Sequence, residues 1–76
     1  MFKVYGSENC KFCRMSKSAL ELVKEPFEYV ALDNDDKLKE KIKLESGSKT
    51  IPVIYKDGEY FGGYSELEEW ITDKYL

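Results

Sequence analysis

Two cysteines separated by two residues are the feature of this 76-residue chain with the clearest chemical meaning. They are Cys10 and Cys13, and the chain contains no histidine. Two thiols at this spacing can form a disulfide with each other, but the loop it would close is too small to stabilise a fold. The spacing therefore indicates redox chemistry or metal binding, with two unrelated core thiols as the plain alternative.

Metal binding is the less favoured of these interpretations. A zinc site needs four ligands, usually cysteine or histidine, and this chain offers two cysteines and no histidine. A zinc ion held within one chain is therefore not expected, and no residue is assigned as a metal ligand. A metal that bridges two copies of the chain stays open as an alternative.

The cysteines lie where a strand and a turn are expected to lead into a helix. Phe2–Tyr5 alternates apolar and polar residues and is rich in strand formers. Residues 6–9 are typical of a turn. Apolar residues then recur at helical spacing from Cys10 to Lys24, and Pro26 ends that helix because it restricts the residue before it.

The start of a helix is a favourable place for a reactive thiol. Free N–H groups and the positive end of the helix dipole stabilise an anion there, which favours the thiolate of Cys10, the form that attacks disulfides. Lys11 and Arg14 add positive charge, and Glu8 subtracts some. Cys13 lies one turn further and should be more covered. We therefore predict that Cys10 is the nucleophile and that Cys13 resolves the mixed disulfide.

The middle of the chain predicts a second strand, a second helix and a third strand. Phe27–Leu32 is expected to form the strand, and the acidic residues 33–36 are expected to begin a helix. That helix should run to about Glu45 and stop near Gly47. Ile51–Tyr55 should form the third strand.

The C-terminal part predicts a hairpin and a last helix. Asp57-Gly58 is a turn signal that should pair the third strand with a fourth at Glu59–Phe61. Ser65 and Glu68 match a capping box that would open the last helix. The residues expected to be buried on this helix are Leu67, Trp70 or Ile71, and Tyr75.

The order of these elements, β-α-β-α-β-β-α, predicts an α/β fold. The first two strands should pair in parallel across the first helix, and the last two should form an antiparallel hairpin. The expected result is a mixed four-stranded sheet flanked by three helices, which cover both faces. Because a chain of this length has room for a single core, residues 1–76 are expected to form one domain.

Composition and charge argue against several classes of function. Apolar residues make up 42% of the chain, which is enough for a globular domain. The net charge of −3 disfavours nucleic acid as the main partner, since phosphate binding needs a basic face. The apolar runs are too short to span a membrane, and the chain opens without a signal-peptide pattern. We expect a cytoplasmic monomer that binds neither nucleic acid nor membranes.

Four lysines alternate with other residues along the second expected helix. They are Lys37, Lys39, Lys41 and Lys43. The pattern predicts the solvent-facing side of an amphipathic helix. A patch that steers an acidic partner is the alternative.

Three separated motifs give the chain a resemblance to the glutaredoxin branch of the thioredoxin fold. Cys10-Lys11-Phe12-Cys13 is similar to the family's C-P-Y-C, Thr50-Ile51-Pro52 to its T-V-P, and Gly62-Gly63-Tyr64-Ser65-Glu66-Leu67 to its G-G-x-[ST]-D-L. The order and spacing of all three make the resemblance specific, and it covers nearly the whole chain. The short chain and its opening also resemble the small phage and bacterial dithiol glutaredoxins, of which the phage members reduce ribonucleotide reductase.

The resemblance implies a thioredoxin-like fold and assigns roles to individual residues. It makes Cys10 and Cys13 catalytic, with Lys11 and Phe12 as accessory residues beside them. It also implies a glutathione-binding site made of Lys49, Thr50, Ile51, Pro52, Gly63, Tyr64, Ser65 and Glu66. Glutathione would then be the reducing co-substrate, and no prosthetic group would be bound.

The implied glutathione site has a physical rationale. A cis bond before Pro52, as the family has, would present the N–H and C=O of Ile51 as a short strand edge for an extended thiol. Glycines at 62 and 63 let the backbone approach a ligand. The helix start at Ser65 suits the γ-glutamyl carboxylate of glutathione, and Glu66 its ammonium group. An ordinary glycine-rich turn before a capped helix is the alternative.

The chain departs from the family pattern at three positions. Ser7 stands where the family often has a cation that contacts the glycine carboxylate of glutathione, and Lys49 is expected to replace that cation in part. Lys11 replaces the family's proline. Glu66 replaces its shorter aspartate.

The leading functional hypothesis is a glutathione-linked thiol–disulfide oxidoreductase. It would reduce protein disulfides and glutathione mixed disulfides, with ribonucleotide reductase as one candidate partner. A thioredoxin-like donor that a thioredoxin reductase recharges is the alternative, which the absence of a cation at Ser7 favours. A dimeric iron–sulfur carrier that uses Cys10 and two glutathiones is a third hypothesis, disfavoured by Lys11 and Cys13.

Overall fold

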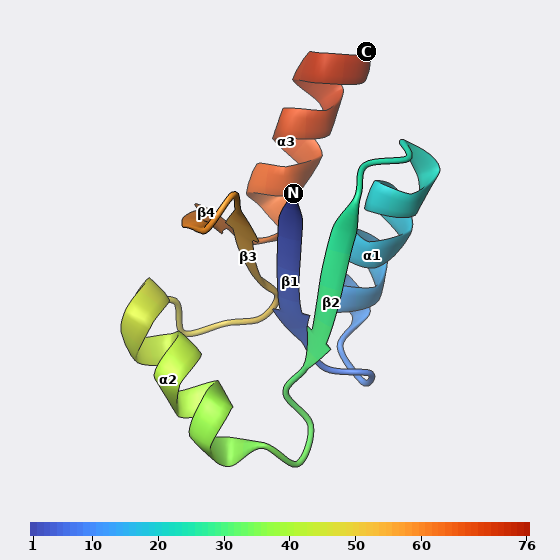
Figure 1. Ribbon diagram of the computed structural model, residues 1–76. Helices are drawn as coiled ribbons and strands as arrows, with labels where there is room; N and C mark the ends of the chain where they lie inside the picture. The colour runs from blue at the N-terminus through green and yellow to red at the C-terminus, as the bar shows by residue number, and fades with distance from the viewer.

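The computed structural model describes residues 1–76 and contains four strands and three helices (Figure 1). They are β1 (Phe2–Gly6), α1 (Lys11–Leu22), β2 (Phe27–Ala31), α2 (Asp36–Ser46), β3 (Val53–Lys56), β4 (Glu59–Gly62) and α3 (Tyr64–Tyr75). The predicted α/β order is confirmed. No helix has both the length and the apolar content needed to cross a membrane.

The four strands form one mixed sheet in the order β2-β1-β3-β4. β1 and β2 are parallel, with Val4 opposite Tyr29, while β3 runs antiparallel to both β1 and β4. Asp57 and Gly58 have positive φ angles of 51° and 86° and form the predicted hairpin turn. Because β1 and β2 are parallel, the loops that follow them emerge at the same edge of the sheet.

Helices cover both faces of the sheet, as predicted. α1 and α3 pack on one face (Figure 1), and the buried cluster there consists of Phe2, Val4, Leu20, Ile54 and Leu67. α2 packs on the other face, where Ile42 contacts Val53 and Tyr55. Successive residues of a strand point to opposite faces, so Val53 and Ile54 belong to different clusters.

Helix α1 is shorter than its apolar spacing predicts. It ends at Leu22, and Lys24 adopts a left-handed conformation with φ of 59°. The N–H of Glu25 donates to the carbonyl of Leu20 at 3.0 Å, which closes the end of the helix. The chain is therefore already turned away before Pro26 is reached.

Helix α2 begins and ends much as the sequence predicts. The Asp35 carboxylate accepts a hydrogen bond from the N–H of Leu38 at 3.1 Å, and Gly47 ends the helix in the left-handed conformation with φ of 74°. Ile42 is buried, whereas the four lysines of this helix are all exposed. The predicted solvent-facing lysine surface is confirmed.

Helix α3 begins at Tyr64, and the predicted capping box of Ser65 and Glu68 is wrong. The N-cap is Gly63, whose N–H donates to the Glu66 carboxylate at 2.6 Å. Ser65 therefore lies inside the first turn. The helix starts early because the extended backbone of Gly63 places its N–H within reach of the Glu66 side chain.

The end of α3 is less buried than predicted. Its buried and half-buried core residues are Leu67, Trp70 and Ile71. Tyr75 is 41% exposed, so its predicted burial is wrong. Its hydroxyl donates to the carboxylate of Glu25 at the turn after α1, which keeps the ring at the surface.

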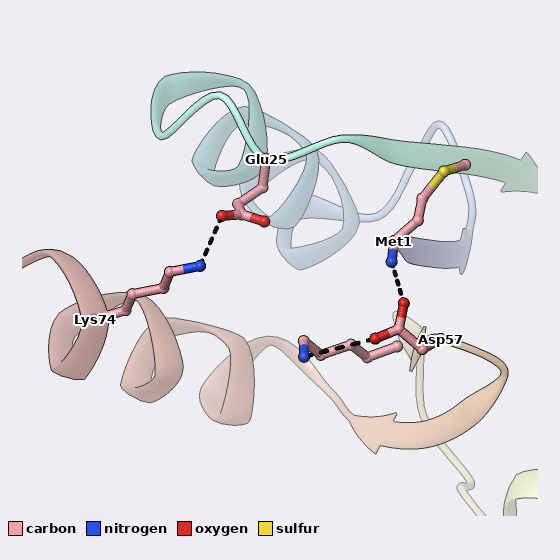
Figure 2. A network of polar contacts seen from close by, with 5 residues as sticks. Met1, Glu25, Asp57 and Lys74 are labelled. Atoms are coloured by element: carbon pink, nitrogen blue, oxygen red, sulfur yellow. Dashed lines mark hydrogen bonds and ion pairs between the residues drawn. The ribbon is translucent and has the colours of Figure 1, made fainter.

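Two exposed ion pairs tie the chain ends to neighbouring turns. Figure 2 shows the ammonium group of Lys74 in α3 pointing toward the carboxylate of Glu25. The two groups are 3.1 Å apart. Figure 2 also shows the N-terminal amine of Met1 at the carboxylate of Asp57, in the turn between β3 and β4. Exposed pairs of this kind contribute little to stability, so the two clusters of apolar side chains hold the fold together.

Candidate active site

Cys10 is the N-cap residue of α1. Its backbone is extended, with φ of −98° and ψ of 118°, and its Sγ accepts a hydrogen bond from the N–H of Cys13 at 3.2 Å. The sulfur thus occupies the position in which a cap oxygen normally satisfies a free N–H group of the first turn. Cys10 is half-buried and is the more exposed of the two cysteines.

Cys13 is fully buried beneath that first turn. A Cβ atom added at Gly6 would lie 2.6 Å from the Cys13 Sγ and 3.0 Å from the Tyr29 hydroxyl, so all three residues meet beneath the cysteine pair. Burial raises the pKa of Cys13 to about 12. At neutral pH Cys13 is therefore a covered thiol, and the expectation that it is the less accessible cysteine is confirmed.

The loop before Cys10 is fixed by a carboxylate from the neighbouring strand end. The Ser7 hydroxyl donates to one oxygen of Asp33 at 2.6 Å, and the N–H of Glu8 donates to the other at 3.0 Å. These bonds hold the pKa of Asp33 below its usual value, with the Ser7 bond the larger cause. The Ser7 carbonyl in turn accepts the N–H of Cys10 at 3.2 Å.

A cis peptide bond between Ile51 and Pro52 faces the cysteines, as the resemblance implied. The Cys10 Sγ lies 3.8 Å from the carbonyl oxygen of Ile51. Strand β3 begins at Val53, two residues later than the sequence predicts. The backbone of Ile51 therefore lies outside the sheet, beside the accessible sulfur.

A groove of about 310 Å³ opens beside the Ile51–Pro52 bond. Its lining residues are Phe12, Thr50, Ile51, Pro52, Gly63, Tyr64, Ser65 and Glu66. The rings of Phe12 and Tyr64 lie 5.6 Å apart across α1 and α3 and form one wall. The groove therefore joins three segments that are far apart in the sequence.

Of the two adjacent glycines beside the groove, only Gly62 is required by close packing. Gly62 has φ of 149°, and a Cβ atom there would lie 2.6 Å from the Cγ of Glu66. A Cβ atom at Gly63 would lie 3.5 Å from the carbonyl oxygen of Pro52, which is an ordinary contact. Gly62 thus lets Glu66 fold back to cap α3, while Gly63 keeps its backbone next to the cis bond.

The structure brings together most, but not all, of the expected site residues. Lys49 is exposed and does not line the groove. Lys11 lies on the outer face of α1, where it lines a different hollow. The sequence reasoning also missed Asp33, although an acidic residue directly after a strand parallel to β1 could have indicated it.

Gly6 and Tyr29 were missed for another reason. Both belong to strands that looked purely structural, and only the packing shows that Gly6 lies against Cys13 and that the Tyr29 hydroxyl lies beside Gly6. No group of three or more histidine, cysteine, aspartate or glutamate side chains is arranged to hold a metal ion.

Comparison with known proteins identifies the family. A family model described as glutaredoxin matches residues 2–61. The chain belongs to the glutaredoxin family. Glutaredoxin of Enterobacteria phage T4 is 32% identical to it over 85 aligned positions, which cover 92% of this chain and 98% of the phage protein. Glutaredoxin 3 of Escherichia coli K12 is 28% identical over 65 positions, which cover 86% and 78% of the two chains.

Solved structures of glutaredoxins share the fold. A buckwheat glutaredoxin–glutathione complex superposes with a TM-score of 0.86 at 20% identity, covering 95% of this chain and 68% of that one. Glutaredoxin 1 of Francisella tularensis, complexed with cacodylate, gives 0.79 at 24% identity, covering 96% and 92%. The mixed sheet and its three helices are therefore the glutaredoxin form of the thioredoxin fold.

Proposed function

We propose that this glutaredoxin is a dithiol oxidoreductase that uses glutathione to reduce protein disulfides and glutathione mixed disulfides. One observation carries the proposal. The accessible sulfur of Cys10 stands 3.8 Å from the carbonyl of Ile51, at the groove beside the cis bond, while the second sulfur is buried one turn behind it. A substrate disulfide that lies along the groove would meet Cys10 before Cys13.

The first half of the reaction is a pair of exchanges at sulfur. The Cys10 thiolate attacks one sulfur of the substrate disulfide, and the other substrate sulfur leaves as a thiolate and takes a proton. Cys13 then gives up its proton and attacks the Cys10 sulfur. The second substrate thiol leaves, and a Cys10–Cys13 disulfide remains.

The second half restores the dithiol. One glutathione thiolate attacks the Cys10–Cys13 disulfide at Cys10, and Cys13 leaves and regains its proton. A second glutathione attacks the sulfur of the first, so Cys10 is released and one glutathione disulfide departs. The buried position of Cys13, where burial raises its pKa to about 12, favours its return to the thiol form.

The groove offers chemically suitable contacts for glutathione. The backbone of Ile51 can pair with an extended peptide as a strand edge does, and the start of α3 offers N–H groups to a carboxylate. The Glu66 carboxylate lies in the same groove, although one of its oxygens already accepts the N–H of Gly63. The buckwheat glutaredoxin, which shares this fold, was solved as a complex with glutathione, and that supports this assignment.

A thioredoxin-like donor is the second candidate, and Ser7 favours it. In place of a free cation, the loop has a serine hydroxyl bound to the carboxylate of Asp33. This arrangement offers no positive charge to a glutathione carboxylate at that position. The candidate differs from the first in the enzyme that recharges it.

Two recycling systems distinguish the candidates. The protein is given a glutathionylated peptide as substrate, with either glutathione and glutathione reductase or thioredoxin reductase as the source of electrons. We expect sustained turnover with glutathione and glutathione reductase, in the absence of thioredoxin reductase. Turnover only with thioredoxin reductase would instead establish the thioredoxin-like function.

The physiological setting follows from the chemistry of the dithiol. A reductant of this kind belongs in a reducing compartment such as the cytoplasm, where it would act as a monomer on oxidised proteins. The disulfide of a ribonucleotide reductase is one candidate substrate. Assay of that enzyme with this protein as its only source of electrons tests the partner directly.

A further inference from the structure

A second hollow lies on the outer side of α1, next to the active-site groove. It has a volume of about 370 Å³ and lies between α1 and the start of α3. Its apolar lining consists of Met15, Ala19, Leu22 and Tyr64, and its cationic lining of Lys11 and Arg14. Leu22 is 83% exposed, so its side chain is open to contact by a partner. We call this hollow the α1–α3 groove.

The α1–α3 groove adjoins the active-site groove. Tyr64 lines both of them, and its ring contacts that of Phe12, which lines the active-site groove. Lys11 directly follows Cys10 in the sequence. The two grooves therefore lie next to each other and share Tyr64, and the cationic end of the α1–α3 groove begins one residue after Cys10.

The positive charge at the inner end of the α1–α3 groove is not neutralised within the chain. None of the four ion pairs in the structure includes Lys11 or Arg14. The Arg14 guanidinium donates to the carbonyl of Glu8, a neutral group, at 2.9 Å. This local charge contrasts with the chain's net charge of −3. An acidic group of a partner would meet two cations with no competing carboxylate bound to them.

The outer end of the groove has the opposite character. It is formed by Ala19 and Leu22 in the last turns of α1, and Glu21 lies between them in the sequence. The groove thus runs from cations beside Cys10 to apolar side chains about three turns away. An occupant that fits it has an acidic residue near its cysteine and an apolar residue further along.

We propose that the α1–α3 groove docks the segment next to the reactive cysteine of a disulfide-bearing protein substrate, with an acidic side chain at Lys11 and Arg14 and an apolar side chain on Met15, Ala19 and Leu22. This inference rests on the proposed function, since the segment is positioned by its mixed disulfide with Cys10. In that step the Cys10 thiolate forms the new disulfide bond and the former partner sulfur leaves as a thiolate.

Docking of this kind separates protein substrates from small ones. A glutathione mixed disulfide occupies only the active-site groove, whereas a protein segment extends beyond the Phe12–Tyr64 pair in either direction. The apolar contacts add binding energy only for the larger substrate. The groove is therefore a specificity surface that the chemical step does not need.

The test uses three synthetic peptides, each with one cysteine activated as a mixed disulfide with thionitrobenzoate. One carries aspartate and leucine beside the cysteine, one lysine and leucine, and one only glycine and serine. We expect the acidic peptide to react with Cys10 about two- to five-fold faster than the basic one for each cation engaged, with the advantage shrinking at high salt. Equal rates for all three peptides would overturn the proposal.

A matched pair of variants tests the apolar part. Leu22→Glu should remove the preference for the leucine-containing acidic peptide, while reduction of hydroxyethyl disulfide stays unchanged. Leu44→Glu is the control, because Leu44 is a similarly exposed leucine, 79% exposed, on α2. Loss of the preference in both variants, or in neither, would contradict the proposed groove.

A spectroscopic readout locates the peptide directly. In a Cys13→Ser variant the mixed disulfide between Cys10 and the acidic peptide should persist, and the methyl resonances of Met15, Ala19 and Leu22 should shift. Shifts confined to residues of the active-site groove would place the peptide elsewhere and refute the docking model. If the protein failed to reduce hydroxyethyl disulfide at all, the proposed function itself would fall, a result distinct from equal peptide rates.

A second copy of the chain is the competing occupant of the groove. It would appear as a concentration-dependent dimer in sedimentation experiments, and Leu22→Glu would abolish that dimer while Leu44→Glu would not. We expect a monomer at all concentrations. A Leu22-dependent dimer would overturn the proposal.

Discussion

The hydroxyl of Ser7 donates to the carboxylate of Asp33 at 2.6 Å, and this bond joins the loop before Cys10 to the end of β2. The same carboxylate accepts the N–H of Glu8, so it fixes two consecutive residues of that loop. Ser7 also accepts the N–H of Cys10 through its carbonyl. The position at which many glutaredoxins have a ligand-binding cation is thus used here to hold the active-site loop.

This bond changes what a cation at position 7 can do. Ser7→Lys should increase glutathione-dependent turnover. The increase should be smaller when Asp33 is present than in combination with Asp33→Asn, because the Asp33 carboxylate would pair with the new ammonium group. We expect about a two- to five-fold gain in kcat/KM for a glutathionylated peptide in the double variant, and a smaller gain at high salt. Steady-state kinetics of the four combinations measure the coupling.

Lys49→Ala is the companion change. Because Lys49 does not line the groove, its loss should lower the same kcat/KM by a smaller factor than Ser7→Lys raises it. The residue is exposed, so its removal should leave the fold intact. If neither Ser7→Lys nor Lys49→Ala altered the Michaelis constant for glutathione, glutathione would not lie across these residues. The thioredoxin-like function would then become the better proposal.

Asp33 also predicts how stability responds to acid. Its pKa is lowered in the folded state, chiefly by the Ser7 hydroxyl and then by the N–H of Glu8. A depressed pKa means that the stabilisation is present above the unfolded-state value of about 3.9 and is lost as the pH falls through the lower folded-state value. We therefore expect the free energy of unfolding, measured with urea, to fall less between pH 5 and roughly pH 2–3 in Asp33→Asn than in the natural chain.

Glu25 and Asp57 contribute to the same acid response. The pKa of Glu25 is lowered mainly by the Tyr75 hydroxyl, and that of Asp57 mainly by the N-terminal amine. Asp33→Asn should consequently flatten the acid profile only in part. An unchanged profile would show that the Ser7–Asp33 bond does not contribute to stability in solution.

The two cysteines should respond differently to substitution. Cys10→Ser should abolish reduction of both protein disulfides and glutathione mixed disulfides, because Cys10 is the half-buried cysteine beside Ile51, whereas Cys13 is buried. Cys13→Ser should lose protein disulfide reduction and keep deglutathionylation, which needs one thiol. Reduction of insulin disulfides measures the first activity, and deglutathionylation of a glutathionylated peptide measures the second. An equal loss in the two variants would show that the assigned roles are wrong.

The burial of Cys13 predicts selective alkylation. At neutral pH iodoacetamide should modify Cys10 and leave Cys13 unmodified, because burial raises the pKa of Cys13 to about 12. Peptide mapping by mass spectrometry after partial reaction identifies the modified thiol. Equal labelling of both cysteines in the folded protein would contradict this arrangement.

The same raised pKa has a consequence at alkaline pH. A thiol whose folded-state pKa lies above its unfolded value stabilises the fold fully below that unfolded value, about 9, and the contribution is lost as the pH rises toward 12. We compare the reduced Cys13→Ser variant with the reduced natural chain. Between pH 8.5 and pH 10.5, roughly the range in which free thiols ionise, the free energy of unfolding should fall less in the variant. Tyr29 and Tyr55, whose pKa values burial raises to about 12, remain in both proteins and serve as the shared background.

Gly6 should not tolerate a side chain. A Cβ atom there would lie 2.6 Å from the Sγ and 2.9 Å from the Cβ of Cys13, both in the tightly packed floor of the site. Gly6→Ala should therefore destabilise the fold by about 1–3 kcal/mol, the usual cost of overpacking. Gly63→Ala is the control, since its Cβ atom would meet nothing closer than 3.5 Å. Equal midpoints of urea unfolding for the two variants would refute the packing argument.

Local sequence patterns were enough to identify the elements and the chemistry of the site. Strand alternation, helical spacing and the Asp57-Gly58 turn each depend on neighbouring residues, so they identified all seven elements and their order. Cys10 and Cys13 are close along the chain, and the helix that starts beside them could be recognised from the same segment. Their spacing pointed to redox chemistry or metal binding, and the absence of histidine favoured redox chemistry.

Packing between distant segments determines which residues surround those cysteines. The Tyr29 hydroxyl lies beside Gly6, and Asp33 binds Ser7, only because β1 and β2 lie side by side in parallel. The start of α3 at Tyr64 and the exclusion of Lys49 from the groove likewise depend on how the segments around Pro52 and Gly63 meet. Contacts of this kind are set by tertiary packing and strand register, and no single stretch of sequence encodes them.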